Sequence, residues 1–422
     1  MSTPAYPSVS DSAADADADA AADTRSAATL AWPAALALAA AMGIGRFAFT
    51  PVWPLMAEEG GLSLAQGSWI ASANYAGYLL GALAAVVWPM RHAGHARVQL
   101  AISLLAVALL TLAMPLTHDV MVWCALRLAA GYASASAFIC VAAGRTVAPG
   151  DPREPAASAL TYAGVGAGIA LTGLACLALM AWGVRADGTW LALGGLTLAL
   201  SAIAWPGLKR PSHVPSSTAH AGPPARVPRV TARLALHYGV FGIGYIIPAT
   251  FLPAMAKQVI ANPAVFGWAW PLFGLAAAVS CLLVPRLARA RDEKRVWQVA
   301  QALMAAGMLA AALWHHIAAV IVAALLVGGT FMVITQAGML TARRMAGAAA
   351  PRAAAIMTAA FAAGQILGPL LASWAGHWGA GLPQVLGGGA ALLAVSAWRL
   401  GKITTEDKGA GHNAIGPQGC TH

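Results

Sequence analysis

Residues 43–51 read Gly-Ile-Gly-Arg-Phe-Ala-Phe-Thr-Pro and lie inside an apolar run that extends from about residue 30 to residue 57. This run is long enough to cross a bilayer, since about 20 apolar residues suffice. Arg46 stands near its middle, where a charge costs between ~3 and ~15 kcal/mol unless it faces a wet cavity or a partner. The Gly-x-Gly before Arg46 and Pro51 after it are expected to loosen the helix at this point. We therefore predict that Arg46 marks a substrate pathway.

The same stretch occurs a second time in the chain. The beginning of the first stretch is repeated by Gly242-Ile243-Gly244-Tyr245, and the later Pro54-Leu55-Met56-Ala57 is repeated by Pro253-Ala254-Met255-Ala256. Both repeats have the same offset along the chain, and Trp69 and Trp268 are separated by that offset too. Further on, Leu193-Gly194-Gly195 matches Leu386-Gly387-Gly388. These matches predict two homologous halves in the same order, with Tyr245 at the position that Arg46 holds in the first half.

The composition indicates an integral membrane protein. Of 422 residues, 59% are hydrophobic and 9% are charged, whereas a soluble protein carries about 25% charged residues. The net charge of +10 would suggest a nucleic-acid partner in a soluble chain, but here the positive charges lie between apolar runs, so we expect no nucleic acid. The sequence has no Cys-x-x-Cys and no metal-ligand spacing, and it implies no cofactor.

Apolar runs of spanning length predict twelve transmembrane helices, six on each side of a polar connector. They lie at about 30–57, 65–90, 97–117, 120–147, 155–183, 188–208, 232–257, 263–288, 296–315, 317–342, 353–377 and 382–400. We therefore expect an N-terminal bundle over 29–208, a central loop over 209–231 and a C-terminal bundle over 232–400. The polar tails, 1–28 and 401–422, are expected to be disordered.

Basic residues predict the orientation in the lipid bilayer. With the N-terminus inside, most of the 25 Lys and Arg residues fall in inner segments, which satisfies the positive-inside rule. Both termini and the central loop are then expected in the cytoplasm. No Asp or Glu falls within a predicted helix, so Arg46 and Arg127 have no carboxylate at membrane depth.

These features resemble a known family of carriers. Two parallel six-helix halves joined by an inner loop are similar to the major facilitator superfamily. Arg127-Leu128-Ala129-Ala130-Gly131-Tyr132-Ala133-Ser134-Ala135 resembles its Arg-x-x-x-Gly-x-x-x-Ala motif, and the first two predicted helices resemble its bacterial YbfB/YjiJ branch. The resemblance implies transport by alternating access, with the first, fourth, seventh and tenth helices lining a cavity. It names no substrate.

The chain also departs from the superfamily pattern at two places. The loop after the second helix lacks the usual Asp of Gly-x-x-x-Asp-Arg-x-Gly-Arg-Arg, so a gating ion pair through that Asp is not expected. The fifth helix contains Gly164, Gly166, Gly168 and Gly173 but lacks the Gly-Pro pair that is typical of drug/proton antiporters. The second departure weakens a drug-export function.

Five residues are predicted to bind substrate. At about 1.5 Å per residue, Arg46 and Arg127 lie at similar depth, where two guanidinium groups could clamp a carboxylate or phosphate; the alternative is that each caps backbone carbonyls of a broken helix. Asn74 and Tyr78 share a helix face, with interhelical hydrogen bonding as their alternative role. Tyr245 is expected to face the same cavity as Arg46.

Coupling to an ion gradient leaves three alternatives. His237 is a candidate proton carrier, although a histidine satisfied at an interface is the competing interpretation. Otherwise the substrate brings the proton, or transport is uncoupled. Gln336 and Gln365 are weaker cavity candidates.

We therefore expect a monomeric transporter in the bacterial inner membrane that moves a small solute, an organic anion in the first instance. The alternative is an exporter of amphipathic or cationic compounds, favoured by the apolar and aromatic character of the helices. A receptor or an intramembrane enzyme is a third class, but the sequence shows no nucleophile–base pair, metal cluster or nucleotide loop, so no enzyme activity is expected.

Overall fold

The computed structural model describes residues 26–88, 93–144, 151–208, 226–259, 267–287, 292–314 and 316–403. These residues form helices and turns and contain no strand, which confirms the all-helical prediction. After helical residues 26–38, the helices are η1 (Ala39–Ile44), α2 (Phe49–Gly60), α3 (Leu64–Val87), α4 (Ala93–Leu112), η2 (Met114–Leu116), α5 (Val120–Ala143), α6 (Glu154–Ala181), α7 (Ala186–Leu208), α8 (Arg229–Val259), α10 (Ala269–Leu287), α11 (Glu293–Leu313), α12 (Ile317–Ala346), η3 (Gly347–Ala349), α13 (Ala350–His377) and α14 (Leu382–Gly401).

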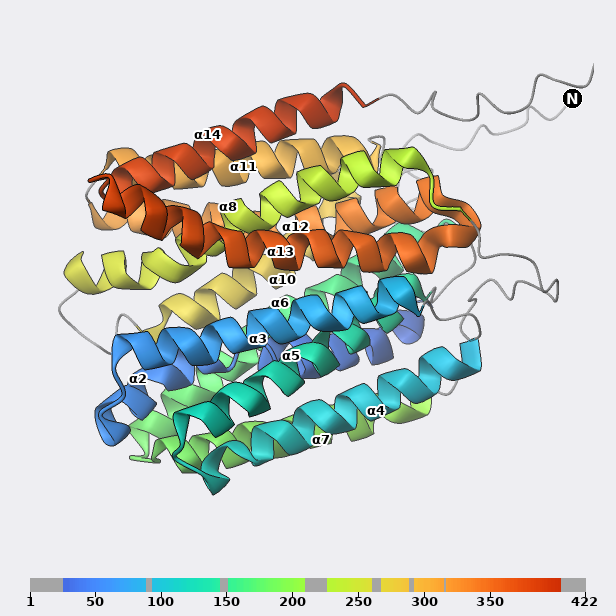
Figure 1. Ribbon diagram of the computed structural model, residues 1–422. Helices are drawn as coiled ribbons and strands as arrows, with labels where there is room; N and C mark the ends of the chain where they lie inside the picture. Colours follow the sequence, from blue (N-terminus) through green and yellow to red (C-terminus); the bar gives the residue numbers. More distant parts are fainter. Residues whose placement is uncertain are drawn as a thin grey trace, which may run out of the picture.

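The helices form two bundles that lie against one another (Figure 1). The N-terminal half, residues 26–208, lies below in this view, and the C-terminal half, residues 229–401, lies above. Two pairs of helices join the halves, since α6 packs along α10 and α3 packs along α13. Most of the predicted tails and of the central loop lie outside the described residues, so the domain boundaries stay a prediction.

The first span is broken beside Arg46, as the glycines predicted. Ser26–Gly60 is one apolar run of 35 residues, but its middle is the π-helix η1 followed by a turn over residues 45–48. In this segment Gly45 N donates to Ala40 O over 3.0 Å, and Phe47 N donates to Met42 O over 3.2 Å. These bonds reach one residue further back than those of an α-helix. The side chain of Arg46 is therefore attached at a break in the helix and not within a regular helical turn.

Glycines allow the helices of the site to approach closely. A Cβ on Gly43 would overlap the backbone of Gly168 on α6. On the opposite side of α6, a Cβ on Gly166 would overlap the backbone of Ala278 on α10, and a Cβ on Gly274 would overlap that of Ala170. The glycines of the fifth predicted helix thus pack α6 against the first span on one side and against the C-terminal half on the other.

The helices follow one another along the chain in the predicted order. Within the described residues, nine segments are long and apolar enough to cross a membrane, and one of them, Ile317–His377, runs through both α12 and α13. Ala269–Pro285 is a shorter apolar helix, and α14 is 20 residues long. The helix order agrees with the predicted one, while the count of twelve membrane crossings stays a prediction.

Candidate functional site

Arg46 lies between the two halves and is only 3% exposed. Its Nη2 donates to Oε1 of Gln365 on α13, and its guanidinium carbon lies 3.7 Å from the centroid of the Tyr78 ring, within the range of a cation–π contact. Its Nε and Nη1 have no hydrogen-bond partner among the described residues. The guanidinium therefore keeps donors that a ligand can use.

Arg127 holds the broken backbone that carries Arg46. It is 2% exposed; its Nη1 donates to Gly45 O over 2.9 Å and its Nη2 to Arg46 O over 2.8 Å. Buried carbonyl groups need such partners because water cannot reach them. This geometry fits the carbonyl-capping alternative, and a direct contact between Arg127 and substrate stays a prediction.

The two predicted residues on α3 have different surroundings. Asn74 Nδ2 donates to Arg127 O over 3.0 Å, and a Cβ on Gly131 would overlap the Asn74 backbone, so Asn74 joins α3 to α5 at close range. Tyr78, one turn further on, is 1% exposed, contacts the Arg46 guanidinium and lines a cavity. The arrangement of Asn74 fits interhelical hydrogen bonding, whereas Tyr78 contributes to the cavity lining, and its contact with substrate stays a prediction.

Tyr245 belongs to a cluster of aromatic rings, most of which lie in the C-terminal half. Its ring stacks on Phe331, with centroids 4.5 Å apart and planes 16° apart. Trp270 stacks on Phe273 at 5.5 Å, and Phe273 lies 5.9 Å from Phe331. Phe47, the residue after Arg46, contacts Trp270 and Phe331 edge-on at 6.3 and 6.1 Å. The aromatic cluster, as we call these five residues, thus spans the boundary between the halves.

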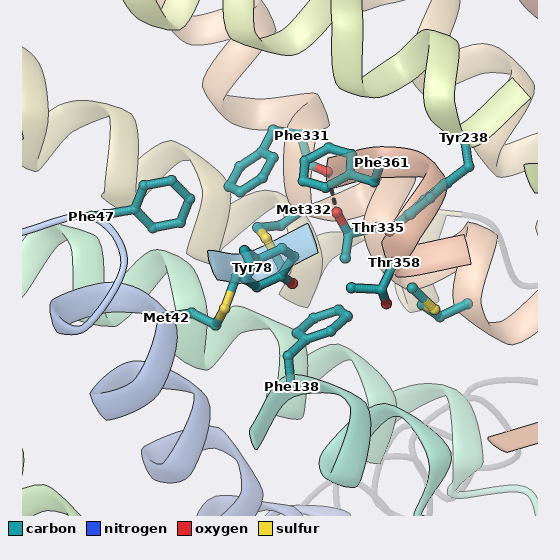
Figure 2. A pocket seen from close by; sticks show the side chains of 11 residues that line it. Met42, Phe47, Tyr78, Phe138, Tyr238, Phe331, Met332, Thr335, Thr358 and Phe361 are labelled. Carbon is teal, nitrogen blue, oxygen red and sulfur yellow. Dashed lines mark hydrogen bonds between the residues drawn. The ribbon is translucent and has the colours of Figure 1, made fainter. Parts of the chain in front are cut away.

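A cavity lies next to the aromatic cluster and receives side chains from both halves. Figure 2 shows Met42, Tyr78 and Phe138 facing Phe331, Thr358 and Phe361 across it. The cavity measures about 10 Å³, which is room for roughly one water molecule. The halves are therefore closed over the site in this conformation, and a substrate of several heavy atoms requires them to separate.

His237 lies away from this cavity. Its Nδ1 is 2.8 Å from Ser396 Oγ on α14, and the residue is 8% exposed. This pairing fits the interpretation of a satisfied histidine, and its role as a proton carrier stays a prediction. Gln336 on α12 is 4% exposed, and its Oε1 has no hydrogen-bond partner among the described residues.

Ion pairs join the halves at the inner end of the bundle, the end where α3, α5 and α12 terminate and which the charge pattern predicts to face the cytoplasm. Glu154, the first residue of α6, lies 3.5 Å from Nη2 of Arg343 and 3.8 Å from Nη2 of Arg344, both on α12. Arg344 also pairs with Glu293 on α11 at 2.7 Å. The Glu154 pairs therefore connect the halves, whereas the Glu293 pair lies within one half.

Several residues of this site are less evident from the sequence than from the structure. Gln365 is a weaker candidate by sequence, yet it binds Arg46 directly. Phe331 and Phe361 are not among the residues that the sequence motifs indicate. Phe361 and Gln365 are four residues apart on α13, so their shared helix face was a signal that the sequence contained. The pairing of Glu154 with Arg343 had no such signal, because the two residues belong to different halves.

Two helical bundles that pack against one another, with a buried arginine at a broken helix between them, are the arrangement expected of a membrane transporter of the major facilitator type. The crystal structure of the human organic anion transporter MFSD10 (TETRAN) has the same fold, with a TM-score of 0.68, 14% sequence identity, and coverage of 90% of this chain and 99% of that one. The family model "Uncharacterised MFS-type transporter YbfB" matches residues 38–399. The chain therefore belongs to this family of membrane transporters. No curated protein sequence matches it.

Proposed function

We propose that the protein is a secondary active transporter that carries a small organic anion across the bacterial inner membrane by alternating access. The observation that carries this proposal is Arg46, a buried guanidinium at a break in the first span. Among the described residues it makes no ion pair with a carboxylate, and two of its nitrogens have no hydrogen-bond partner. A buried cation without a counter-ion favours an anionic ligand, because pairing removes much of the cost of burying the charge. The name of the structural neighbour, an organic anion transporter, agrees with this substrate class.

Alternating access would work through contacts that cross the boundary between the halves. Arg46 belongs to one half and Gln365 to the other, so an anion bound at Arg46 can also reach the second half. The Glu154 pairs with Arg343 and Arg344 favour a closed inner end. Transport to that side then requires these pairs to break while the other end closes.

For the coupling ion, we propose that the substrate brings its own proton. The position of His237 argues against that residue as the carrier, because its Nδ1 pairs with Ser396 on the α14 side of α8 and not in the cavity. Collapsing the pH gradient during uptake into proteoliposomes is expected to slow transport in wild type and in a His237→Gln variant equally. If the variant alone no longer responds to the gradient, His237 carries the proton instead. Uptake that persists unchanged without a gradient would mean that transport is uncoupled.

The experiment that tests the anion site is thermal unfolding of the purified protein with small carboxylates, neutral sugars and cationic drugs. A ligand at 100 times its dissociation constant stabilises the folded state by about 2.7 kcal/mol. We expect carboxylates to raise the unfolding temperature of wild type and to have no effect on Arg46→Gln. Arg185→Gln is the matched control, because Arg185 is an exposed arginine that pairs with Glu59 away from the cavity. An unchanged response in Arg46→Gln would refute the anion site.

Export of amphipathic or cationic compounds is the second candidate function. The observation in its favour is the cavity lining, which is mainly aromatic and methionine side chains, as is common in sites for apolar ligands. The same panel decides between the two: cationic drugs that stabilise wild type and Arg46→Gln alike would support the exporter.

A further inference from the structure

The geometry points to a class of substrate: a monoanion whose single carboxylate is attached to a planar aromatic body. The carboxylate would bind Arg46 and Gln365, and the ring would lie against the aromatic cluster. This inference rests on the proposed function and adds to it the number of charges and the shape of the substrate.

The free hydrogen-bond donors of the site favour one carboxylate. Arg46 offers Nε and Nη1, and Gln365 Nε2 is also buried without a hydrogen-bond partner among the described residues. The second arginine at this depth, Arg127, has both terminal nitrogens bound to backbone carbonyls and keeps only its Nε without a hydrogen-bond partner among the described residues. A dicarboxylate or a phosphate would therefore bring a second charge to the site that finds fewer free donors than the first finds at Arg46 and Gln365, which is costly.

The aromatic cluster provides a surface for a flat ring. Within the C-terminal half, Tyr245 stacks on Phe331 at an interplanar angle of 16°, and Trp270 stacks on Phe273 at 7°. Near-parallel rings of this kind leave faces on which another ring can pack. Trp270 Nε1 is buried without a hydrogen-bond partner among the described residues, so a polar substituent on the ring would also find a donor.

The position of Phe47 explains how such a ring would enter. Phe47 is attached to the N-terminal half, while Trp270 and Phe331, the residues it contacts, are attached to the other half. Separation of the halves breaks these two contacts but leaves the stacked pairs of the C-terminal half intact. The substrate ring would then take the place of Phe47 and pack against Trp270 and Phe331. The cavity of about 10 Å³ would expand to admit it.

In each half, a polar side chain that could bind the carboxylate lies close to an aromatic side chain that could contact the ring. Arg46 and Phe47 are consecutive residues, and the Arg46 guanidinium carbon lies 5.7 Å from the Phe47 ring centroid. On α13, Gln365 and Phe361 are one helical turn apart, and Phe361 lies 6.1 Å from Tyr245. Both halves thus present a polar group beside an aromatic one, which matches a carboxylate attached directly to a ring or through a short linker.

Binding to the purified full-length protein tests the inference, with benzoate, cyclohexanecarboxylate, acetate, succinate and benzamide as probes and thermal unfolding as the readout. Benzoate is expected to bind about 10- to 100-fold more tightly than acetate, because its ring buries an area like that of a Phe side chain. It is expected to bind about two- to tenfold more tightly than cyclohexanecarboxylate through ring stacking. Benzamide, which lacks the charge, and succinate, which has two, should bind weakly.

Two variants connect this preference to the aromatic cluster. Phe331→Leu is expected to reduce the advantage of benzoate over cyclohexanecarboxylate to less than twofold while leaving acetate binding unchanged. Trp374→Leu is the matched control, since Trp374 is an aromatic residue 64% exposed on the outside of α13. It should keep the wild-type preference.

The outcomes separate the two proposals. If acetate and succinate bind as tightly as benzoate, and Arg46→Gln abolishes binding of all three, the anion site stands and the aromatic monoanion is wrong. If the preference for benzoate persists in Phe331→Leu, the cluster does not hold the ring and the inference is also wrong. If no carboxylate binds, or Arg46→Gln binds them as wild type does, the proposed function itself fails.

Discussion

At the scale of single residues, the two buried arginines make different contacts. Arg46 has one hydrogen bond to Gln365 and two nitrogens without a partner among the described residues. Arg127 uses both terminal nitrogens on the carbonyls of Gly45 and Arg46. We infer that Arg127 is a positioning residue, which fixes the backbone from which Arg46 extends.

Arg127→Met is therefore expected to reduce stability more than it reduces ligand recognition. The substitution leaves two buried carbonyls without their donors, at about 1–3 kcal/mol for each. We expect a lower unfolding temperature in detergent and, in the fraction that remains folded, a carboxylate response that survives in weakened form. The measurement is thermal unfolding with and without the carboxylate probe.

Arg185→Met serves as the control for loss of a positive charge, because the side chain of Arg185 is 76% exposed. It should leave the unfolding temperature nearly unchanged. A normal unfolding temperature together with complete loss of carboxylate binding in Arg127→Met would mean that Arg127 contacts the substrate directly.

At the scale of elements, α6 and α10 approach one another closely across the boundary between the halves. A Cβ on Gly274 would overlap Ala170 N and Gly166 O. Two helix backbones this close have no room for a side chain larger than hydrogen, and small residues of this kind allow dense packing in membranes. A larger residue at either glycine would force the two helices apart locally.

Gly274→Ala is expected to destabilise the protein by about 1–3 kcal/mol, the usual cost of overpacking, and to slow transport. Gly195→Ala on α7 is the matched control, because nothing lies within 4 Å of a Cβ at that position. There the alanine should stabilise the helix by up to about 1 kcal/mol. Equal unfolding temperatures for the two variants would contradict the close α6–α10 packing.

The elements also show what sequence analysis could and could not predict. The break beside Arg46 was predictable because Gly43, Gly45 and Pro51 are local signals that act within one helix. The partner of Arg46 was not, because Gln365 lies 319 residues away and no periodicity links the two positions. Of the aromatic cluster, the sequence indicated only Tyr245 as a cavity residue; the cluster as a whole was not predictable for the same reason, since its five rings come from four separate segments.

At the scale of the whole molecule, the Glu154 pairs connect the halves at the inner end. The side chains of Glu154 and Arg343 are only 11% and 9% exposed. Removing one member of such a buried pair leaves the other charge uncompensated. The conformation with this end closed should therefore depend on the charge of Glu154.

Glu154→Gln is expected to shift the population toward conformations with a separated inner end. Spin labels at two exposed positions near this end, Val98 on α4 and Val299 on α11, would report a longer and broader distance distribution by pulsed electron resonance, in a background without native cysteines. Glu293→Gln is the control, because Glu293 pairs with Arg344 inside one half. Glu293→Gln should give the wild-type distance distribution. If Glu154→Gln gives it as well, the Glu154 pairs do not hold the inner end closed.

The separation of Arg46 from Gln365 along the chain also has a consequence for biogenesis. The first span enters the membrane during synthesis, before Gln365, the hydrogen-bond partner of Arg46, has been translated. At about 5–20 residues per second, the 319 intervening residues require roughly 15 to 60 s. In the folded protein, the ring of Tyr78 in the next span lies nearer to the Arg46 guanidinium than the rings of Phe47 and Tyr75, so this ring is available to shield the charge during the interval. The nascent chain should therefore insert its first two spans together, and a ribosome stalled between them would leave a substrate for membrane quality control.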